Sequence, residues 1–198
     1  MPPADSHDKQ LMIRVASGDK PAFRELVSRH QNTVFAIAYR YLGDAADAEE
    51  IAQEAFCRLY AAAGRYRPEA AFRTNLLRIV TNLCSNRRAR AYRRREESRN
   101  PGDLDIADDT MNPRSAVLAA ERCQALRDAV AALPDEQRIT LILARFEGLS
   151  YEEISALTGR SVSSVTSTLW RARASLRRSL DKWVQESSPD PVTTSRSK

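Results

Sequence analysis

Apolar residues recur at helical spacing along most of the chain, and no stretch alternates with the period of two that marks a strand. The longest regular stripe lies in the last third, at Val165, Leu169, Ala172 and Leu176. These positions follow i, i+4, i+7 and i+11, which places them on one face of a helix. The pattern therefore predicts an all-α fold.

The same period, interrupted by Gly and Pro, predicts the remaining elements. We expect helices over 10–16, 21–43, 44–60, 72 to about 90, 119–133 and 134–146, with a loop over 64–71. They form one small helical domain over 9–95 and a second over 116–184, joined by a flexible acidic linker over 96–115. The ends, 1–8 and 185–198, are predicted to be disordered. The expected core faces of the two helices after the linker carry Ala119, Cys123, Leu126, Val130, Leu133, Ile139, Ile142, Leu143 and Phe146.

Local signals delimit two further helices near the C-terminus. Ser150 followed three residues later by Glu153 is a capping box, which starts a short helix at Tyr151. Gly159 can adopt the left-handed conformation that ends a helix. Ser161 is then a natural N-cap for a longer helix. The sequence therefore predicts a helix, a tight turn and a second helix.

The face of the longer helix opposite its apolar stripe is small, polar and cationic. It carries Ser163, Ser167, Trp170, Arg171 and Arg178, with Ser164 beside them. A DNA-binding helix-turn-helix needs this layout, because one face packs on its neighbours while the other enters the major groove. A solvated basic helix in an ordinary bundle is the simpler alternative.

Charge is distributed in blocks. The 198 residues carry a net charge of +5 with a pI near 9.4, which suits a nucleic-acid partner without proving one. Residues 44–54 hold five acids and no base, whereas 58–95 hold eleven arginines and Glu69 as the sole acid. Acids dominate again over 96–109, and bases over 160–182. Two basic blocks separated by an acidic segment predict two nucleic-acid contacts on one chain.

The sequence does not support an enzymatic, metal-binding or membrane-spanning protein. Cys57, Cys84 and Cys123 are odd in number and widely spaced, which argues against a disulfide framework and a zinc site. His7 and His30 are equally isolated, so we predict no catalytic residue, no metal and no cofactor. No apolar run reaches the length of a membrane span, and the first residues lack a signal-peptide core. We therefore expect a cytoplasmic protein without membrane insertion.

Four stretches, in this order, resemble the extracytoplasmic-function group of bacterial RNA polymerase sigma factors. They are GDKPAFRELVSRH, LGDAADAEEIAQEAFCRLY, AFRTNLLRIVTNLCSNRRAR and LPDEQRITLILARFEGLSYEEISALTGRSVSSVTSTLWRARASL. The second and fourth are the specific signals, because a helix-turn-helix alone also occurs in many repressors. The resemblance implies a non-enzymatic subunit that binds core RNA polymerase and directs promoter-specific initiation in a stress or envelope response. A stand-alone helix-turn-helix regulator is the alternative, and it leaves the acidic 44–54 segment unexplained.

The resemblance also implies where partners bind. The acidic helix is expected to bind the polymerase clamp through Asp47, Glu50, Gln53 and Glu54. The following loop and helix are expected to hold the minus-ten element as single-stranded DNA through Arg67, Phe72, Asn75, Arg78, Asn82, Asn86, Arg87 and Arg88. The helix-turn-helix is expected to read the minus-thirty-five element through Arg160, Ser163, Ser164, Thr166, Ser167, Arg171 and Arg178. Expected partners are the clamp and flap regions of core polymerase, promoter DNA and an anti-sigma factor.

Some of these features have alternative interpretations. The polar stripe of Asn75, Arg78, Asn82 and Asn86 also fits a solvated helix face. The acidic linker is either a tether or a segment that enters the polymerase cleft, where Asp103, Asp105, Asp108 and Asp109 would imitate RNA. The chain departs from the family pattern at four positions, where Trp, two basic residues and an apolar residue are usual: Asn75, Thr166, Thr168 and Arg160.

Overall fold

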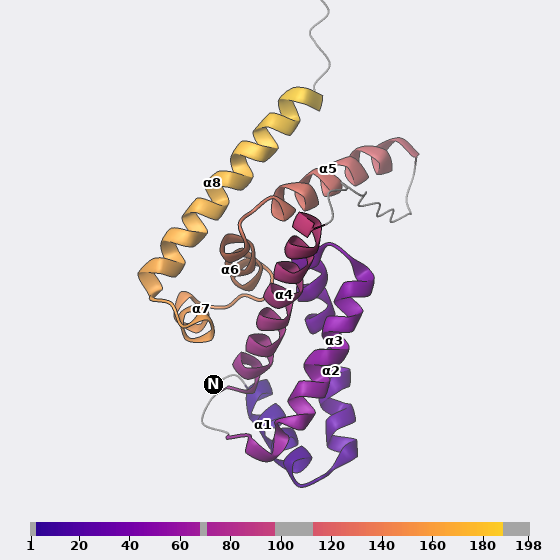
Figure 1. The fold of residues 1–198 in the computed structure, drawn as a ribbon, viewed down its shortest axis with the longest axis vertical. Helices are drawn as coiled ribbons and strands as arrows, with labels where there is room; N and C mark the ends of the chain where they lie inside the picture. Colours follow the sequence, from indigo (N-terminus) through magenta and orange to yellow (C-terminus); the bar gives the residue numbers. More distant parts are fainter. Residues whose placement is uncertain (1–2, 68–70, 98–112, 188–198) are drawn as a thin grey trace, which may run out of the picture.

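The structure is a computed structural model that describes residues 3–67, 71–97 and 113–187, and every regular element within these ranges is helical (Figure 1). The first unit contains α1 (Pro3–Ala16), α2 (Lys20–Leu42), α3 (Ala45–Ala61), the short 3-10 helix η1 (Ala63–Arg65) and α4 (Phe72–Glu97). The second contains α5 (Pro113–Ala131), α6 (Asp135–Arg145), α7 (Tyr151–Thr158) and α8 (Val162–Ser187). The predicted all-α fold with two helical units is confirmed.

Side-chain caps and left-handed glycines define the helix ends of the first unit. The Asp19 carboxylate accepts a hydrogen bond from the Ala22 backbone N–H at 3.0 Å and so caps α2. Gly43 ends α2 with a φ of 80°, a conformation that costs glycine little because it lacks a Cβ. Asp44 then caps α3 by accepting from the Asp47 N–H at 2.7 Å. The short turn at Gly43 and Asp44 brings α3 back against α2, and α4 packs on both.

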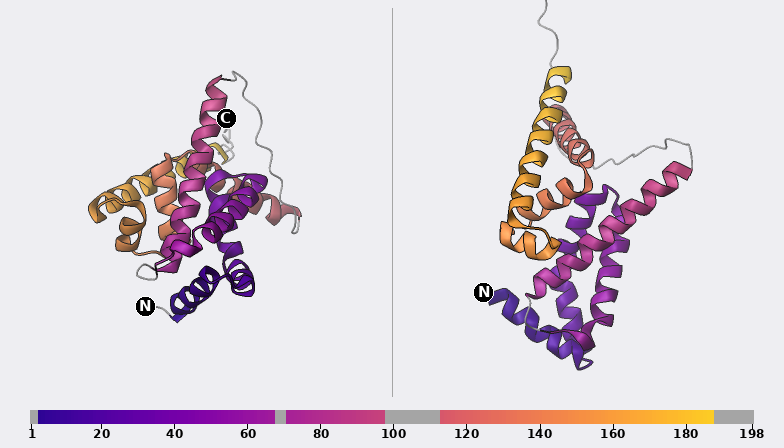
Figure 2. Two further views of the ribbon diagram at one scale, coloured as in Figure 1. Left: turned by 60° about the horizontal axis from the view of Figure 1, so that its bottom comes forward. Right: turned by 60° about the vertical axis from the view of Figure 1, so that its left-hand side comes forward.

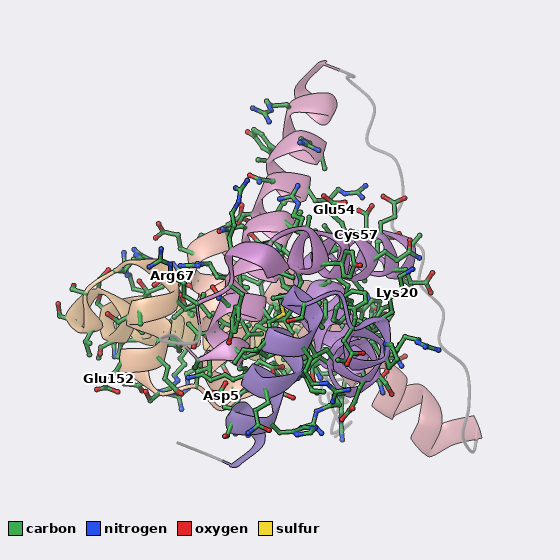
Figure 3. The ribbon with its side chains drawn as sticks, turned by 90° about the horizontal axis from the view of Figure 1, so that it is seen from below. Asp5, Lys20, Glu54, Cys57, Arg67 and Glu152 are labelled. Atoms are coloured by element: carbon green, nitrogen blue, oxygen red, sulfur yellow. The ribbon has the colours of Figure 1, made fainter. Side chains whose placement is uncertain are left out.

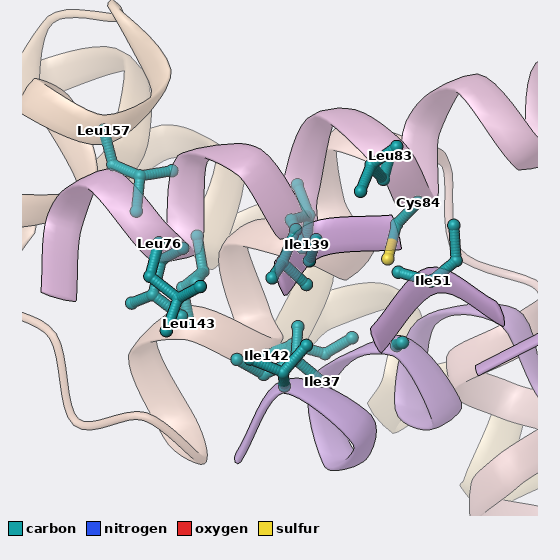
Figure 4. Close-up of a cluster of buried hydrophobic side chains, with 14 of the residues drawn as sticks. Ile37, Ile51, Leu76, Leu83, Cys84, Ile139, Ile142, Leu143 and Leu157 are labelled. Carbon is teal, nitrogen blue, oxygen red and sulfur yellow. The ribbon is translucent and has the colours of Figure 1, made fainter. Parts of the chain in front are cut away.

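The two units pack directly on each other. Ile142 and Leu143 of α6 are fully buried, and in Figure 4 they lie beside Ile37 of α2 and Leu76 of α4. Leu157 of α7 approaches the same part of α4. Figure 2 shows α7 and α8 on one side of α4, with α3 on the other. One continuous apolar core therefore runs through both units.

A buried arginine that the sequence analysis did not identify holds the centre of this interface. Arg138 of α6 has no exposed surface. Its guanidinium donates to the carbonyl oxygens of Val130 at 2.9 Å, Leu133 at 2.9 Å and Tyr41 at 3.0 Å, and also to that of Ala131. Tyr41 belongs to α2, and the other three acceptors belong to the end of α5 and the turn after it. Arg138 thus satisfies carbonyls that a helix C-terminus leaves unpaired, in both units at once.

Polar contacts surround the apolar part of the interface. Arg88 Nε of α4 lies 2.6 Å from the Asp135 carboxylate of α6. Arg73 Nη2, also from α4, donates to the Glu147 backbone oxygen at 2.8 Å and to its carboxylate at 3.1 Å. Arg40 of α2 stacks over the Phe146 ring, 4.4 Å from its centroid. These contacts fix how the second unit sits on the first.

The predicted disorder at the N-terminus is wrong for residues 3–8, which form the first turns of α1. Asp5 and Asp8 are buried there against other helices, a tertiary effect that composition does not reveal. α4 also continues to Glu97 and α8 to Ser187, beyond the predicted boundaries, and α5 begins earlier, at Pro113. The acidic positions at 103, 105, 108 and 109 lie outside the described residues.

Three predicted core residues of the second unit are exposed. Cys123 is exposed, and Leu126 is 45% exposed in a hollow that it lines together with the end of α2 and Phe146. Phe146 is 49% exposed, although its ring is partly covered by Arg40. Helical periodicity identified an apolar side of α5, but only part of that side meets a neighbouring helix. Leu133 is buried in the core, whereas Val130, one turn after Leu126, is half-buried.

Candidate polymerase and nucleic-acid interfaces

α3 has one buried face and one charged face. The buried face carries Ala48, Ile51, Ala55, Phe56 and Leu59. On the opposite side Glu50, Gln53 and Glu54 are exposed and Asp47 is half-buried. These four residues follow i, i+3, i+6 and i+7, so they share one surface, here called the acidic face. Figure 3 labels Glu54 on this helix, and its carboxylate accepts a hydrogen bond from Arg58 Nε at 2.7 Å.

A base from another helix also neutralises part of the acidic face. Arg87 Nη1 of α4 lies 2.9 Å from the Asp47 carboxylate, and Arg87 Nη2 donates to the Glu50 carboxylate. The hydrogen bond to Glu50, together with the charge of Asp47, raises the pKa of Arg87 above its ordinary value. From the sequence, Arg58 was the only basic residue expected near these carboxylates. Arg87 is 37 residues from Glu50 and reaches it only because α4 packs on α3. Arg87, predicted to bind DNA, is therefore paired with the acidic face of α3 in this conformer.

A hollow of about 500 Å³ lies where the acidic face meets α4. From α3 it is lined by Glu50, Gln53, Glu54 and Cys57. From α4 it is lined by Asn86, Arg87 and Arg90. The predicted polymerase residues and part of the predicted minus-ten residues thus adjoin on one side of the first unit.

The polar stripe of α4 lies on the surface of the first unit. Arg78, Asn82 and Asn86 are exposed, and Asn75 is half-buried with its Oδ1 accepting from Arg78 Nη2 at 2.7 Å. The opposite face carries the buried residues Leu76, Leu77, Val80 and Leu83. Arg67, before α4, is also exposed. Amides and cations along one accessible helix face can bind the bases and backbone of a single strand.

Two residues predicted to bind the minus-ten element are engaged elsewhere. Phe72 has no exposed surface, and its ring lies 5.3 Å from that of His30, so the prediction of a base contact is corrected to a core role. As the first residue of α4, Phe72 points inward because the helix packs on α2 there. Arg88 is bound to Asp135 and to the Ala131 carbonyl across the interface between the units.

The predicted helix-turn-helix has its expected local geometry. Ser150 and Glu153 form both hydrogen bonds of a capping box, at 3.1 and 2.8 Å. Gly159 ends α7 in the left-handed region with a φ of 71°. The Ser161 hydroxyl accepts from the Ser164 N–H at 3.3 Å and caps α8. The stripe beginning at Val165 packs on the core as predicted.

The face of α8 opposite that stripe is accessible. Its exposed residues include Ser163, Thr166, Ser167, Trp170, Arg171 and Arg178, with Ser164 half-buried. Trp170 is 71% exposed, which is high for so large an apolar side chain. Arg171 lies along its own helix, where its Nε donates to the Ser167 carbonyl at 3.3 Å. These side chains form one accessible surface, here called the reading face, which corresponds to the face that helix-turn-helix proteins present to a major groove.

Arg160 and Thr168 differ from the rest of this set. The Arg160 guanidinium lies 2.8 Å from the Glu136 carboxylate of α6, so it also braces the turn between α7 and α8. Thr168, at a position where the resemblance leads us to expect a basic residue, is buried.

The cysteines have three different environments. Cys57 is exposed at the edge of the acidic face, Cys84 is buried and Cys123 is exposed. Burial raises the pKa of the Cys84 thiol to about 12, so it remains protonated. Within the described residues, no group of His, Cys, Asp and Glu side chains is arranged to hold a metal ion. None of the helices in the described ranges combines the length and the apolar content that crossing a bilayer requires.

Comparisons with known proteins cover both units. Residues 26–95 match the family model of sigma-70 region 2, and residues 123–176 match that of sigma-70 region 4. The RNA polymerase sigma-H factor of Pseudomonas aeruginosa is 34% identical over 192 residues, which cover 90% of this chain and 96% of that protein. The ECF RNA polymerase sigma-E factor of Escherichia coli K12 is 33% identical over 180 residues, covering 85% and 92%.

A solved structure shares the arrangement of helices. CnrH, determined in complex with the cytosolic domain of CnrY, aligns with a TM-score of 0.66 and 28% identity over 89% of this chain and 98% of that chain. The relatives match along nearly their whole length, and the two family models fall on the two helical units in the expected order. The chain therefore belongs to the extracytoplasmic-function sigma factors of RNA polymerase.

Proposed function

We propose that this chain binds core RNA polymerase through the acidic face, opens the minus-ten element with α4 and reads the minus-thirty-five element with α8. It acts in the cytoplasm as an initiation factor without catalytic activity of its own. An anti-sigma factor is the expected inhibitory partner, and a stress or envelope response is the expected setting. Polymerase clamp and flap regions are the proposed docking points.

The observation that carries the proposal is the pairing of two different surfaces on the first unit. The acidic face suits a basic protein surface, and the adjoining polar stripe of α4 suits unpaired DNA. The reading face of α8 supplies a separate duplex contact on the second unit. A stand-alone regulator needs the reading face of α8, but it needs neither the acidic face nor the polar stripe of α4.

Co-purification with core polymerase, followed by transcription from a promoter library, tests the proposal. We expect stoichiometric binding to core enzyme and initiation restricted to promoters that share two elements. Promoter binding by the free chain, with no association with polymerase, would instead support the stand-alone regulator.

Replacing Arg171 with alanine is expected to weaken binding to the minus-thirty-five element. Arg171 lies in the middle of the reading face, and loss of a base contact costs about 1–3 kcal/mol. If the guanidinium binds a phosphate instead, the loss should be similar for all upstream sequences, and the salt slope should fall by about one. Binding isotherms at several salt concentrations distinguish these two contacts.

Arg173→Ala is the matched control for Arg171→Ala. It removes the same charge from the same exposed helix, but on the flank near the buried stripe. Upstream binding should respond less to this change. Equal affinities of wild type and Arg171→Ala on every promoter would mean that α8 is not the recognition helix.

Replacing Asn82 with alanine is expected to reduce promoter opening while leaving polymerase binding intact. The Asn82 amide is exposed on the polar stripe, where it can donate and accept at once to the edge of an extruded base. Permanganate reactivity of unpaired thymines, on duplex promoters and on templates with a pre-melted bubble, measures this step. We expect a defect on the duplex and a changed base preference at one non-template position.

Asn32→Ala, an exposed amide of α2 in the same unit, is the control for Asn82→Ala. Its effect on stability should not exceed about 0.5 kcal/mol, and opening should be unchanged. Wild-type permanganate reactivity of Asn82→Ala on both templates would assign Asn82 to a solvated helix face.

A further inference from the structure

Two carboxylates at the N-terminal end of α1 are buried, outside the part of the chain that matches the region 2 model. Asp5, labelled in Figure 3, is 7% exposed, and Asp8 is 3% exposed. Burying an ionised carboxylate is costly unless hydrogen bonds and opposite charges compensate it. The partners of these two residues therefore indicate what the beginning of α1 does.

Asp8 connects α1 to the side chain that packs on the first residue of α4. Its Oδ1 accepts from Arg29 Nε at 2.8 Å, and its Oδ2 lies 2.9 Å from His30 Nε2. The His30 ring in turn packs against Phe72, with the ring centroids 5.3 Å apart. A buried carboxylate with two such partners holds the His30 ring in one orientation, and the His30 ring holds Phe72.

Asp5 acts on the backbone of α4. Its Oδ1 accepts from the Arg73 backbone N–H at 3.4 Å. The residue before α4 is Ala71, which has no side-chain acceptor to cap the free N–H groups of the first turn. Asp5 thus supplies from another helix the negative group that a local N-cap normally provides. Lys9, one turn further along α1, lies 3.6 Å from its other oxygen.

Tyr66, directly after η1, lies in the same place. Burial, with the charges of Asp5 and Asp8, raises the pKa of its hydroxyl to about 12. The hydroxyl oxygen is buried and has no hydrogen-bond partner among the described residues. The beginning of α1 therefore packs against both ends of the connection between η1 and α4.

We propose that Asp5 and Asp8 are positioning residues for promoter opening, which hold the start of α4 in the geometry that captures single-stranded minus-ten DNA. The proposal rests on the proposed function, because it assumes that α4 reads that strand. Neither carboxylate touches DNA in this mechanism. Both act through Arg73, His30 and Phe72 on the residues that follow, the half-buried Asn75 and the exposed Arg78.

Alanine and asparagine substitutions at position 5 in the full-length chain test the proposal. Asp5→Ala removes the acceptor for the Arg73 N–H, whereas Asp5→Asn keeps an oxygen in the same place. We expect Asp5→Ala to slow opening of a duplex promoter about five- to tenfold, the size of effect that a lost helix cap produces. Asp5→Asn should recover most of that loss, and a pre-melted template should reduce it.

Asp8→Asn gives a second, independent variant, and Asp19→Asn is the control. The Asp19 carboxylate caps α2 and pairs with Arg14 of α1, so the same change of charge there should leave opening unchanged. Binding to core polymerase and to the minus-thirty-five element is measured in parallel and should stay within about twofold of wild type. If the proposed function is wrong, the wild-type protein itself will not bind core polymerase or open a promoter. If only the positioning role is wrong, wild type will do both, and the variants will open the promoter equally well.

Two results would overturn the positioning role. One is wild-type opening by both Asp5→Ala and Asp8→Asn. The other is a loss of opening that parallels an equal loss of polymerase binding, because that would show general destabilisation of the first unit. A defect restricted to duplex opening supports the proposal.

Discussion

Glu50→Lys combined with Glu54→Lys is expected to abolish binding to core polymerase and leave the fold intact. Both carboxylates are largely exposed, so their ion pairs with Arg87 and Arg58 contribute little to folding. Reversing both charges places like charges against a basic partner surface, which costs several kcal/mol. A loss of about 3 kcal/mol corresponds to more than a hundredfold weaker binding. Size-exclusion co-elution and a titration with labelled core enzyme measure it.

The control for this charge reversal changes the same number of charges elsewhere. Glu25→Lys with Glu121→Lys alters exposed acids of α2 and α5, away from the acidic face. This variant should bind polymerase like wild type. If the Glu50→Lys, Glu54→Lys protein is folded by circular dichroism and co-elutes normally, the acidic face is not the polymerase site.

Arg138→Met is expected to destabilise the protein by about 3 kcal/mol, within the range for removing one partner of a buried charged network. Methionine fills much of the same volume but leaves the carbonyls of Tyr41, Val130, Ala131 and Leu133 without their donor. Urea unfolding monitored by circular dichroism should show a lower midpoint. Loss of the bond to Tyr41 should also loosen the second unit from α2, which greater hydrogen exchange along the end of α2 would reveal.

Arg145→Met, at an exposed position of the same helix, should change stability by no more than about 0.5 kcal/mol. Arg138→Lys should be intermediate, because an ammonium has three donors and cannot reproduce the planar fork of a guanidinium. An unfolding midpoint of Arg138→Met equal to that of wild type would show that water replaces the guanidinium without cost.

Features governed by neighbours in sequence could be predicted. The capping box at Ser150, the left-handed Gly159 and the cap at Ser161 each depend on atoms within five residues, and all three occur as expected. The stripe from Val165 is also buried, because a helix long enough to present one apolar face has to cover it. The reading face of α8 follows from that stripe by geometry.

Features that depend on helix packing could not be predicted in this way. The pairing of Arg87 with Glu50 spans 37 residues, and the bond from Arg138 to Tyr41 spans 97. In the sequence, Arg138 cannot be told from an arginine exposed to solvent, because the carbonyl groups that it binds belong to other helices and turns. The same limit explains why Phe146 was predicted to lie in the core, since periodicity shows a face but not its neighbour. Phe72 was assigned to DNA by the family resemblance alone, and the structure buries it.

The close packing of the two units has a consequence for promoter search. Elements named minus ten and minus thirty-five are about 25 base pairs apart, or roughly 80 Å along a straight duplex at ~3.4 Å per step. In this conformer Arg88 of α4 lies 2.6 Å from Asp135 of α6, and one continuous apolar core joins the two units. Where the two units read both elements within the polymerase complex, as proposed, every ~1.4 kcal/mol that favours the packed over the separated arrangement lowers the apparent promoter affinity tenfold.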